Sequence, residues 1–198
     1  MSGEDRLAAA TAVVEDGGLV VYPTETVYGL GADALDPDAV ESVFETKRRD
    51  RDDPLSLAVP TVEAALEYVR PSTTEEQFMR EFLPGPVTVV LEGAESVPDV
   101  LTGGRERVGV RIPDHDLARD LLERTGPLTA TSANVSGRPS VTHLTELDPE
   151  IRTAAGAILD GGETPGTAST VVDVGQGTIH RRGADADAVA AWLDAHSQ

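Results

Sequence analysis

The chain has 198 residues, enough for one well-buried domain, and it has no cysteine, which excludes disulfides, thiolate metal sites and cysteine nucleophiles. Acidic residues number 35 and basic residues 16, so the formal net charge at pH 7 is −19. That charge argues against unaided, non-specific binding to nucleic acid, which depends on cationic surfaces.

The first part of the chain alternates helical and strand patterns. In chain order these predict a helix at 4–16, a strand at 19–22, a polar loop at 24–31, a helix at 36–46, a strand at 55–59, and helices at 61–69 and 72–82. Gly17 and Gly18 end the first helix, and Asp36 followed by Pro37 opens the second.

The remainder interleaves strands and helices less regularly. It predicts strands at 87–91 and 108–112, a helix at 115–124, a strand at 128–131, a turn-rich loop at 132–138, a helix near 145–155, strands near 156–160, 170–174 and 178–181, and a helix at 185–195. Because several strands are neighbours, we expect an α/β or α+β fold with a twisted sheet of mixed direction flanked by helices. Residues 1–198 should form a single domain, since no linker-like segment divides them.

Fifteen of the sixteen basic residues are arginine, and the single lysine is Lys47. It begins the most basic stretch of the chain, at the end of the predicted helix 36–46. Lysine is a mobile point charge whereas arginine is a planar fork, so the two are not interchangeable where an anion is bound. Two interpretations stay open at this point: an anion site that Lys47 shares with Arg49, or a solvated helix end whose charge complements the helix dipole.

Scarce lysine, excess acid and many small apolar residues together are typical of proteins adapted to concentrated salt. At molar salt the Debye length falls to about 3 Å, so an acidic surface barely repels an anion that reaches a local basic cluster. The net charge therefore does not exclude a phosphate-bearing substrate.

Three other segments carry candidate binding groups. Residues 22–31 offer hydroxyls and glycines that suit a small polar ligand or an ordinary loop. In a strand, Arg107 and Arg111 share a face across Gly109, which predicts either a carboxylate or phosphate clamp or an exposed sheet face. Residues 129–139 add small hydroxyls and the amide of Asn134 at a strand end.

Several catalytic designs are absent from the sequence. No Walker-type glycine loop precedes Lys47, no serine has a histidine in a familiar triad pattern, and the four histidines lack metal-ligand spacing. The candidates are therefore cations and neutral hydroxyls. Such a set favours nucleotidyl transfer, in which a substrate oxygen attacks the α-phosphate while the protein positions the reactants and stabilises charge.

Six motifs, in order, resemble the YrdC-like family of threonylcarbamoyl-AMP synthases over nearly the whole chain. They are YPTETVYGLG at 22–31, the K-x-R pair at 47–49, PGPVT at 84–88, VRIPDH at 110–115, SANVSG at 132–137 and STVVD at 169–173. The resemblance implies a YrdC-like fold with a cationic concave face. It also implies an enzyme that makes threonylcarbamoyl-AMP, pyrophosphate and water from L-threonine, bicarbonate and ATP, for the threonylcarbamoyl-adenosine modification of tRNA.

The resemblance also implies roles for residues at matching positions. Lys47 and Arg49 are implied to be catalytic. The implied threonine-binding residues are Thr26, Arg111 and Ser169, with Arg111 the partner of the carboxylate. The implied ATP-binding residues are Lys47, Arg49, Ser132, Asn134, Thr142 and Arg181. No side chain is implied as a metal ligand, and Mg²⁺ is expected to arrive with ATP.

The sequence departs from the family's usual pattern at Asp50, Asp53, Ala58, Arg107, Ala168 and Arg182. Asp53 replaces an asparagine that contacts nucleotide in some members, and Ala58 replaces a threonine-pocket histidine of longer members. Nucleotide contacts at Asp53 and Arg107, and the completion of the threonine pocket, therefore stay open. The C-terminal domain of longer members is expected to be absent.

Two alternative functions remain at this point. One is a carbamoyl-adenylate-forming domain of another pathway, and the other is a non-enzymatic RNA-binding module, which seven aromatic residues equip poorly for base stacking. With no signal peptide and no membrane span in the sequence, the protein is expected to be cytoplasmic. The expected downstream partner is a tRNA-modifying threonylcarbamoyltransferase. The sequence leaves open the oligomeric state and direct contact with tRNA.

Overall fold

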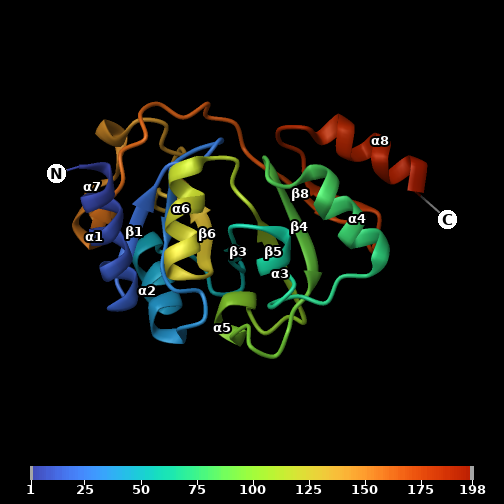
Figure 1. The fold of residues 1–198 in the computed structure, drawn as a ribbon, viewed down its shortest axis with the longest axis horizontal. Helices are drawn as coiled ribbons and strands as arrows, with labels where there is room; N and C mark the ends of the chain where they lie inside the picture. Colours follow the sequence, from blue (N-terminus) through green and yellow to red (C-terminus); the bar gives the residue numbers. More distant parts are fainter. Residues whose placement is uncertain (1, 197–198) are drawn as a thin grey trace.

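The computed structural model describes residues 2–196, and its central feature is one sheet of nine strands (Figure 1). The strands are β1 (Leu19–Tyr22), β2 (Gly29–Gly31), β3 (Ser56–Ala58), β4 (Val87–Glu92), β5 (Arg107–Arg111), β6 (Leu128–Ser132), β7 (Ala155–Ile158), β8 (Thr170–Asp173) and β9 (Thr178–Arg181). Their order across the sheet is β7-β1-β2-β6-β3-β5-β4-β8-β9. The pairs β1–β7, β3–β5 and β4–β8 are parallel and the other five are antiparallel, so the expected mixed sheet is confirmed.

Helices flank this sheet. They are α1 (Gly3–Glu15), α2 (Pro37–Lys47), α3 (Val62–Ala65), α4 (Thr73–Phe82), α5 (Asp99–Thr102), α6 (Asp116–Thr125), α7 (Pro149–Ala154) and α8 (Ala186–His196), with a 3-10 turn, η1 (Leu144–Glu146). Side-chain caps explain three of the starts: Ser2, Asp36 and Ser72 each accept a backbone N–H of the first turn of α1, α2 or α4. Between residues 2 and 196, no helix is both long and apolar enough to cross a membrane.

The two faces of the sheet are covered differently. Leu19 and Val21 of β1 pack into the main core, to which α2, α4 and α8 contribute, whereas Val20 and Tyr22 pack into a second core with α1 and α6. Helices α1 and α6 lie side by side over the half of the sheet that contains β1 and β6 (Figure 1). The face that they share continues over β3, β5, β4 and β8, where polar side chains line a cavity.

The expected polar loop at residues 24–31 is wrong at its end, because Gly29–Gly31 forms strand β2. Val20 pairs with Gly31 and Tyr22 with Gly29 across the antiparallel ladder. A Cβ on Gly29 would lie 3.0 Å from the Tyr22 ring, and one on Gly31 would lie 2.9 Å from it. The glycines that indicate a loop in the sequence therefore make room for a tyrosine in a strand pair.

Three short elements also differ from expectation. The helix expected at 61–69 stops at Ala65, because Arg70 N–H donates to the carbonyl of Glu92 and ties the chain to the sheet. The helix expected near 145–155 divides into η1 and α7, since Pro149 disfavours a helical conformation at the residue before it. Helix α5 was not expected, and it is only four residues long.

Candidate active site

The candidate site is a cavity of about 700 Å³ on the part of the sheet that α1 and α6 leave open. Successive side chains along the strands point alternately into the cavity and into the core. Thr88, Gly109 and Arg111 face the cavity, while Val89 and Val110, the next residues along β4 and β5, are fully buried in the core. The charged lining residues are Arg49, Arg105, Arg107, Arg111, Arg181, Asp53 and Asp173, and His180 also lines the cavity. The lining is therefore cationic although the whole chain is strongly acidic.

Arg111 is oriented by two neighbours from the loop after β1. Its Nη2 donates to Thr26 Oγ1 at 2.6 Å and to Glu25 Oε1 at 2.9 Å. Thr24 Oγ1 lies 2.9 Å from Thr26 Oγ1 and also donates to the carbonyl of Val27 at 2.7 Å. The hydroxyls and the guanidinium thus form one connected polar group at this end of the cavity, and a buried Glu25 Oε2 is left without a hydrogen-bond partner.

Ser169 and Arg181 meet beside this group. Arg181 donates through Nη2 to Ser169 Oγ at 2.7 Å and through Nε to the Ser169 carbonyl at 3.0 Å. Thr88 Oγ1 lies 3.3 Å from Ser169 Oγ. Since β4 pairs with β8 and β8 with β9, the sheet itself brings these three residues together.

The arginines of the cavity influence one another. Burial lowers the pKa of Arg181 below its usual range, and the positive charges of Arg111 and Arg49 lower it further. Burial also lowers the pKa of Arg49, which the carboxylate of Asp53 partly offsets. Arg49 donates to the carbonyls of Asp53 and Pro54 at 2.9 and 3.0 Å. Desolvated like charges that share a cavity favour the binding of an anion.

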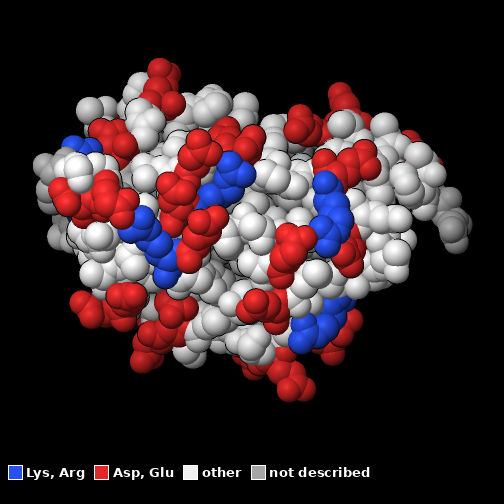
Figure 2. Space-filling view, in the orientation of Figure 1, with Lys and Arg blue, Asp and Glu red and all other residues white. Residues whose placement is uncertain are grey.

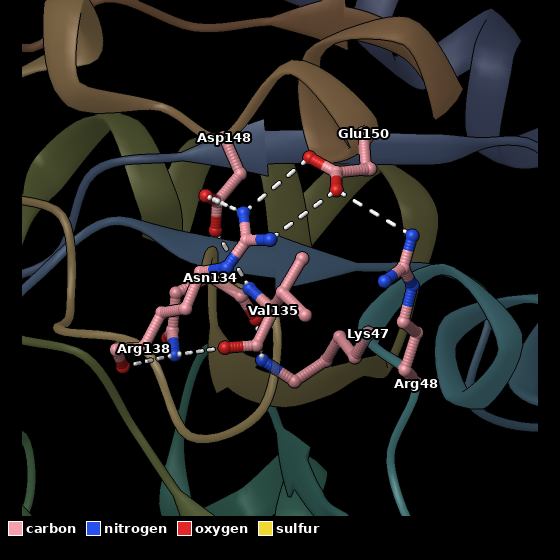
Figure 3. Close-up of polar contacts among 7 residues, drawn as sticks. All are labelled: Lys47, Arg48, Asn134, Val135, Arg138, Asp148 and Glu150. Atoms are coloured by element: carbon pink, nitrogen blue, oxygen red, sulfur yellow. Dashed lines mark hydrogen bonds and ion pairs between the residues drawn. The ribbon is translucent and has the colours of Figure 1, made fainter.

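Lys47 is not among the residues that line the cavity. It lies behind Ser132 in the cavity wall and is only 1% exposed. Its ammonium donates to the backbone carbonyls of Ser132 and Asn134, the latter at 2.7 Å (Figure 3). Burial, followed by the charge of Arg49, lowers the pKa of Lys47 to about 8. The solvated helix end considered from the sequence is therefore wrong, since a solvated ammonium would be exposed.

The structure brings most of the residues with expected site roles to one cavity. Six line it: Thr26, Arg49, Arg111, Ser132, Ser169 and Arg181. Lys47 and Asn134 are not among its lining residues and lie behind Ser132; the Asn134 amide donates to the carbonyls of Val135 and Arg138. Thr142 is also outside the lining, and its hydroxyl donates to Glu146 Oε2 at 3.2 Å.

Arg107 also lines the cavity, but its Nη2 is already engaged. Nη2 donates to Glu75 Oε1 and Asp173 Oδ1, both at 3.0 Å, and to the carbonyl of Val90 at 2.7 Å. Burial raises the pKa of Glu75, but hydrogen bonds from Ser72, and then the Arg107 guanidinium, hold it below its ordinary value. The clamp expected from Arg107 and Arg111 is therefore unequal, with Arg107 paired to internal carboxylates.

Thr88, Arg105, Asp173 and His180 line the cavity, although sequence reasoning gave none of them a role. Strand alternation could have found Thr88 and Asp173, since each is two or four residues from another inward-facing position on its strand. Arg105 lies outside a strand, and nothing in its local sequence indicates which way it faces. Among residues 2–196, no group of three or more histidine, aspartate and glutamate side chains is arranged to hold a metal ion.

Comparisons with known proteins agree with this geometry. Residues 12–183 match the Sua5/YciO/YrdC family model, which is described as Telomere recombination. The chain is 43% identical over 175 residues to the threonylcarbamoyl-AMP synthase of Pyrococcus abyssi, covering 86% of this chain and 51% of that protein. It is 32% identical over 185 residues to the threonylcarbamoyl-AMP synthase of Photobacterium profundum, covering 90% of this chain and 100% of that protein.

One solved structure adds a spatial match. The crystal structure of P. abyssi Sua5 complexed with L-threonine superposes with a TM-score of 0.86 at 40% identity, over 92% of this chain and 55% of that one. The present chain therefore spans about half the length of the Pyrococcus relatives that it matches.

Proposed function

The chain belongs to the Sua5/YciO/YrdC family, and from that premise we propose that it is a nucleotidyltransferase that forms threonylcarbamoyl-AMP and pyrophosphate from L-threonine, bicarbonate and ATP. One observation carries the proposal. Arg111, already bonded to Thr26, shares a single cavity with a second cationic group made by Arg49 and Arg181. A carboxylate substrate and a polyphosphate can therefore be held next to each other.

The threonine end of the cavity is proposed to be the group around Arg111. A guanidinium binds a carboxylate through paired hydrogen bonds, and the hydroxyls of Thr26 and Ser169 can bond the substrate's polar groups. The relative from P. abyssi was crystallised with L-threonine, and the match to it covers 92% of this chain. Ala58 lines the cavity with a methyl group, which leaves space beside Arg111.

The ATP end is proposed to lie at Arg49, Ser132 and Arg181. Arg49 and Arg181 would contact the phosphates directly, and Arg49 is the proposed catalytic residue. Lys47 and Asn134 would act from behind Ser132, where the Lys47 ammonium adds positive charge beneath the phosphates. We propose that Thr142 contacts nucleotide near Ser140, which lines the cavity, and that Mg²⁺ enters bound to ATP.

The proposed chemistry needs no protein nucleophile. The threonine amine takes up bicarbonate and loses water to give a carbamate. A carbamate oxygen then forms a bond to the α-phosphorus, the bond from that phosphorus to the bridging oxygen breaks, and pyrophosphate leaves with the electron pair. Fixed cations that stabilise the charge on the α-phosphate and on the leaving pyrophosphate lower the barrier most, because they need no reorganisation.

The product would serve the threonylcarbamoyl-adenosine modification of tRNA, with a threonylcarbamoyltransferase as the next enzyme. We propose that the protein works in the cytoplasm and at high salt, and that residues 1–198 form one YrdC-like domain. Acidic side chains cover much of the surface in Figure 2, and the basic ones there lie beside acids. The exposed Arg80 illustrates this pattern, since it bonds both Glu63 and Glu76.

The test is pyrophosphate release in molar KCl with ATP, L-threonine and bicarbonate, each omitted in turn, together with detection of threonylcarbamoyl-AMP by mass spectrometry. All three substrates should be required. Pyrophosphate release that is independent of threonine would refute the proposal, and product formation from carbamoyl phosphate instead of bicarbonate would favour a different carbamoyl-adenylate pathway.

A further inference from the structure

Residues 132–138, hereafter the 132–138 loop, begin at Ser132 in the cavity lining, and their backbone is held from two sides. On one side, the Lys47 ammonium donates to the carbonyls of Ser132 and Asn134. The backbone of Lys47 contributes as well, because its carbonyl accepts the N–H of Ser136 at 2.8 Å. The end of α2 and this loop are thus tied together by three hydrogen bonds.

On the other side, Asp148 holds the same loop. Its Oδ2 accepts the backbone N–H of Val135 at 2.9 Å, and its Oδ1 pairs with Arg138 Nη1 at 2.5 Å (Figure 3). Asp148 occupies the N-cap position of α7, where aspartate usually accepts an N–H of its own helix, yet it makes no such bond. Its carboxylate binds the 132–138 loop instead of capping the helix that it precedes.

A second acid from α7 extends the network to α2. Glu150 Oε1 lies 3.4 Å from Arg138 Nη2 and 3.5 Å from Arg48 Nη2 (Figure 3). Arg48 is the C-cap of α2, in a left-handed conformation with φ of 50°. The start of α7 therefore braces both the 132–138 loop and the turn that separates Lys47 from Arg49.

Asp148 and Lys47 both bind the 132–138 loop, and they also attract each other electrostatically. The Val135 N–H, then Arg138 and Lys47, hold the pKa of Asp148 below its usual range. In the opposite direction, the carboxylates of Asp148 and Asp53 raise the pKa of Lys47, against burial and Arg49, which lower it. A buried ammonium keeps its proton only where such anions offset desolvation.

We propose that Asp148 is a positioning residue for the synthase reaction: it fixes the 132–138 loop, whose carbonyls hold the Lys47 ammonium near the phosphate end of the cavity, without touching substrate. The inference rests on the proposed function for its catalytic meaning. Its physical content, a carboxylate on α7 that controls a loop and a buried cation, can be measured without any substrate.

Because Lys47 is the only lysine, protein labelled with [¹³Cε]lysine gives one side-chain resonance, and its pH titration in NMR reports Lys47 alone. In the wild type the pKa should lie near 8. Asp148→Asn keeps an oxygen for the Val135 N–H but loses the charge, so the pKa of Lys47 should fall by about 0.5 pH unit or more. A Lys47 titration that Asp148→Asn leaves unchanged would overturn the proposal.

Asp33→Asn is the matched control. Asp33 is also half-buried and accepts one backbone N–H, from Leu35 at 2.8 Å, but it is not among the charges that act on Lys47. Its variant should leave both the Lys47 titration and the activity at wild-type values. A fall in the Lys47 pKa in Asp33→Asn as large as that in Asp148→Asn would also count against the inference.

Kinetics separate positioning from a loss of folded protein. Asp148→Asn should raise KM for ATP by about 3- to 10-fold with kcat within about 2-fold, and the alkaline limb of kcat/KM for ATP should move to lower pH with the Lys47 titration. Partial unfolding would instead lower kcat at constant KM, and that result would contradict the proposal. If the wild type makes no threonylcarbamoyl-AMP, the proposed function fails while the Lys47 titration still decides this inference.

If Asp148→Asn does not fold, Arg138→Gln provides the second route, since Arg138 is nearly half exposed. Losing the ion pair should loosen Asp148, so the Val135 amide should exchange hydrogen at least about 5-fold faster and KM for ATP should rise. The Lys47 pKa should not fall, because the Asp148 charge remains. Wild-type exchange at Val135 together with wild-type KM would refute the positioning role.

Discussion

Arg111 shows how a single residue can be prepared for a ligand by its own neighbours. The side chain is 13% exposed, and the contacts to Glu25 and Thr26 fix its orientation. A fixed guanidinium loses little rotamer freedom when a carboxylate binds, so more of the interaction appears as affinity. Glu25, 14% exposed, supplies the opposite charge that allows Arg111 to be buried.

Arg111→Lys should therefore raise KM for threonine by about 10- to 100-fold, since an ammonium cannot replace the two parallel hydrogen bonds of a guanidinium. Initial rates at varied threonine and saturating ATP measure the change. Arg124→Lys, on a surface ion pair with Glu4, is the control and should behave as wild type. A KM for threonine within 2-fold or so of wild type in Arg111→Lys would remove Arg111 from the substrate site.

Lys47 is a residue whose environment the sequence could not predict. Its position at a helix end, at the start of a basic run, indicates exposure. However, Arg48 adopts a left-handed conformation, and the Ser132 and Asn134 carbonyls that accept from the ammonium are some 85 residues away in sequence. Long-range acceptors leave no local signal. The motif resemblance could indicate that Lys47 matters, but not that it lies behind the cavity wall.

The depressed pKa of Lys47 predicts a pH effect on stability. Between pH 8 and about 10.5 the unfolded chain binds the lysine proton more tightly than the folded protein does, so stability should rise with pH through this range. Relative to Lys47→Met, the wild type should gain roughly 3 kcal/mol from pH 8 to 10.5. Urea unfolding of both proteins across that range tests it, and a constant difference between them would contradict the expectation.

At the scale of elements, β5 contributes side chains both to the hydrophobic core and to the cavity. Val108 and Val110 belong to the core, while Arg107, Gly109 and Arg111 line the cavity. This alternation could be predicted from the sequence, and it placed both arginines correctly. Strand β2 could not be predicted in the same way, because its glycines are explained only by the ring of Tyr22 on the neighbouring strand.

Gly109→Ala should disturb both the core and the cavity. Its Cβ would overlap the Ser56 hydroxyl on β3 and lie 3.0 Å from Thr88 Cγ2 on β4. Overpacking between paired strands should cost about 1 to 3 kcal/mol of unfolding free energy and reduce activity. Gly3→Ala in α1, where a Cβ meets nothing within 4 Å, is the control for denaturant unfolding. If Gly109→Ala is as stable as the wild type, the close strand contact is not a constraint.

At the scale of the whole molecule, a net charge of −19 surrounds a cavity lined by five arginines. The sign of the net charge could be predicted from composition. The gathering of basic side chains in the cavity, away from the acidic surface, depends on the fold. Arg105 lies just before β5 and Arg107 is its first residue. The fold gathers both of them in the cavity with Arg49, Arg111 and Arg181. Surface repulsion should weaken the protein at low salt, whereas the cavity should keep its attraction for anions.

Stability should therefore depend strongly on salt. The melting temperature is expected to rise by roughly 10 °C between 0.2 M and 3 M KCl, or about 3 kcal/mol for a chain of this length. Thermal unfolding followed by circular dichroism measures it, with sucrose at equal osmolality as a control that does not screen charge. A melting temperature that rises equally in sucrose would show that screening is not the cause.

The order of the strands has a consequence for biosynthesis. The cavity wall combines Tyr22 of β1 with Thr88 of β4, Ser169 before β8 and Arg181 of β9. Strand β8 pairs with β4, which lies in the middle of the chain, and β9 pairs with β8. A nascent chain therefore cannot complete the cavity wall until residue 181 has left the ribosome. Folding of the N-terminal strands can begin earlier, but ligand-binding competence must come last during translation.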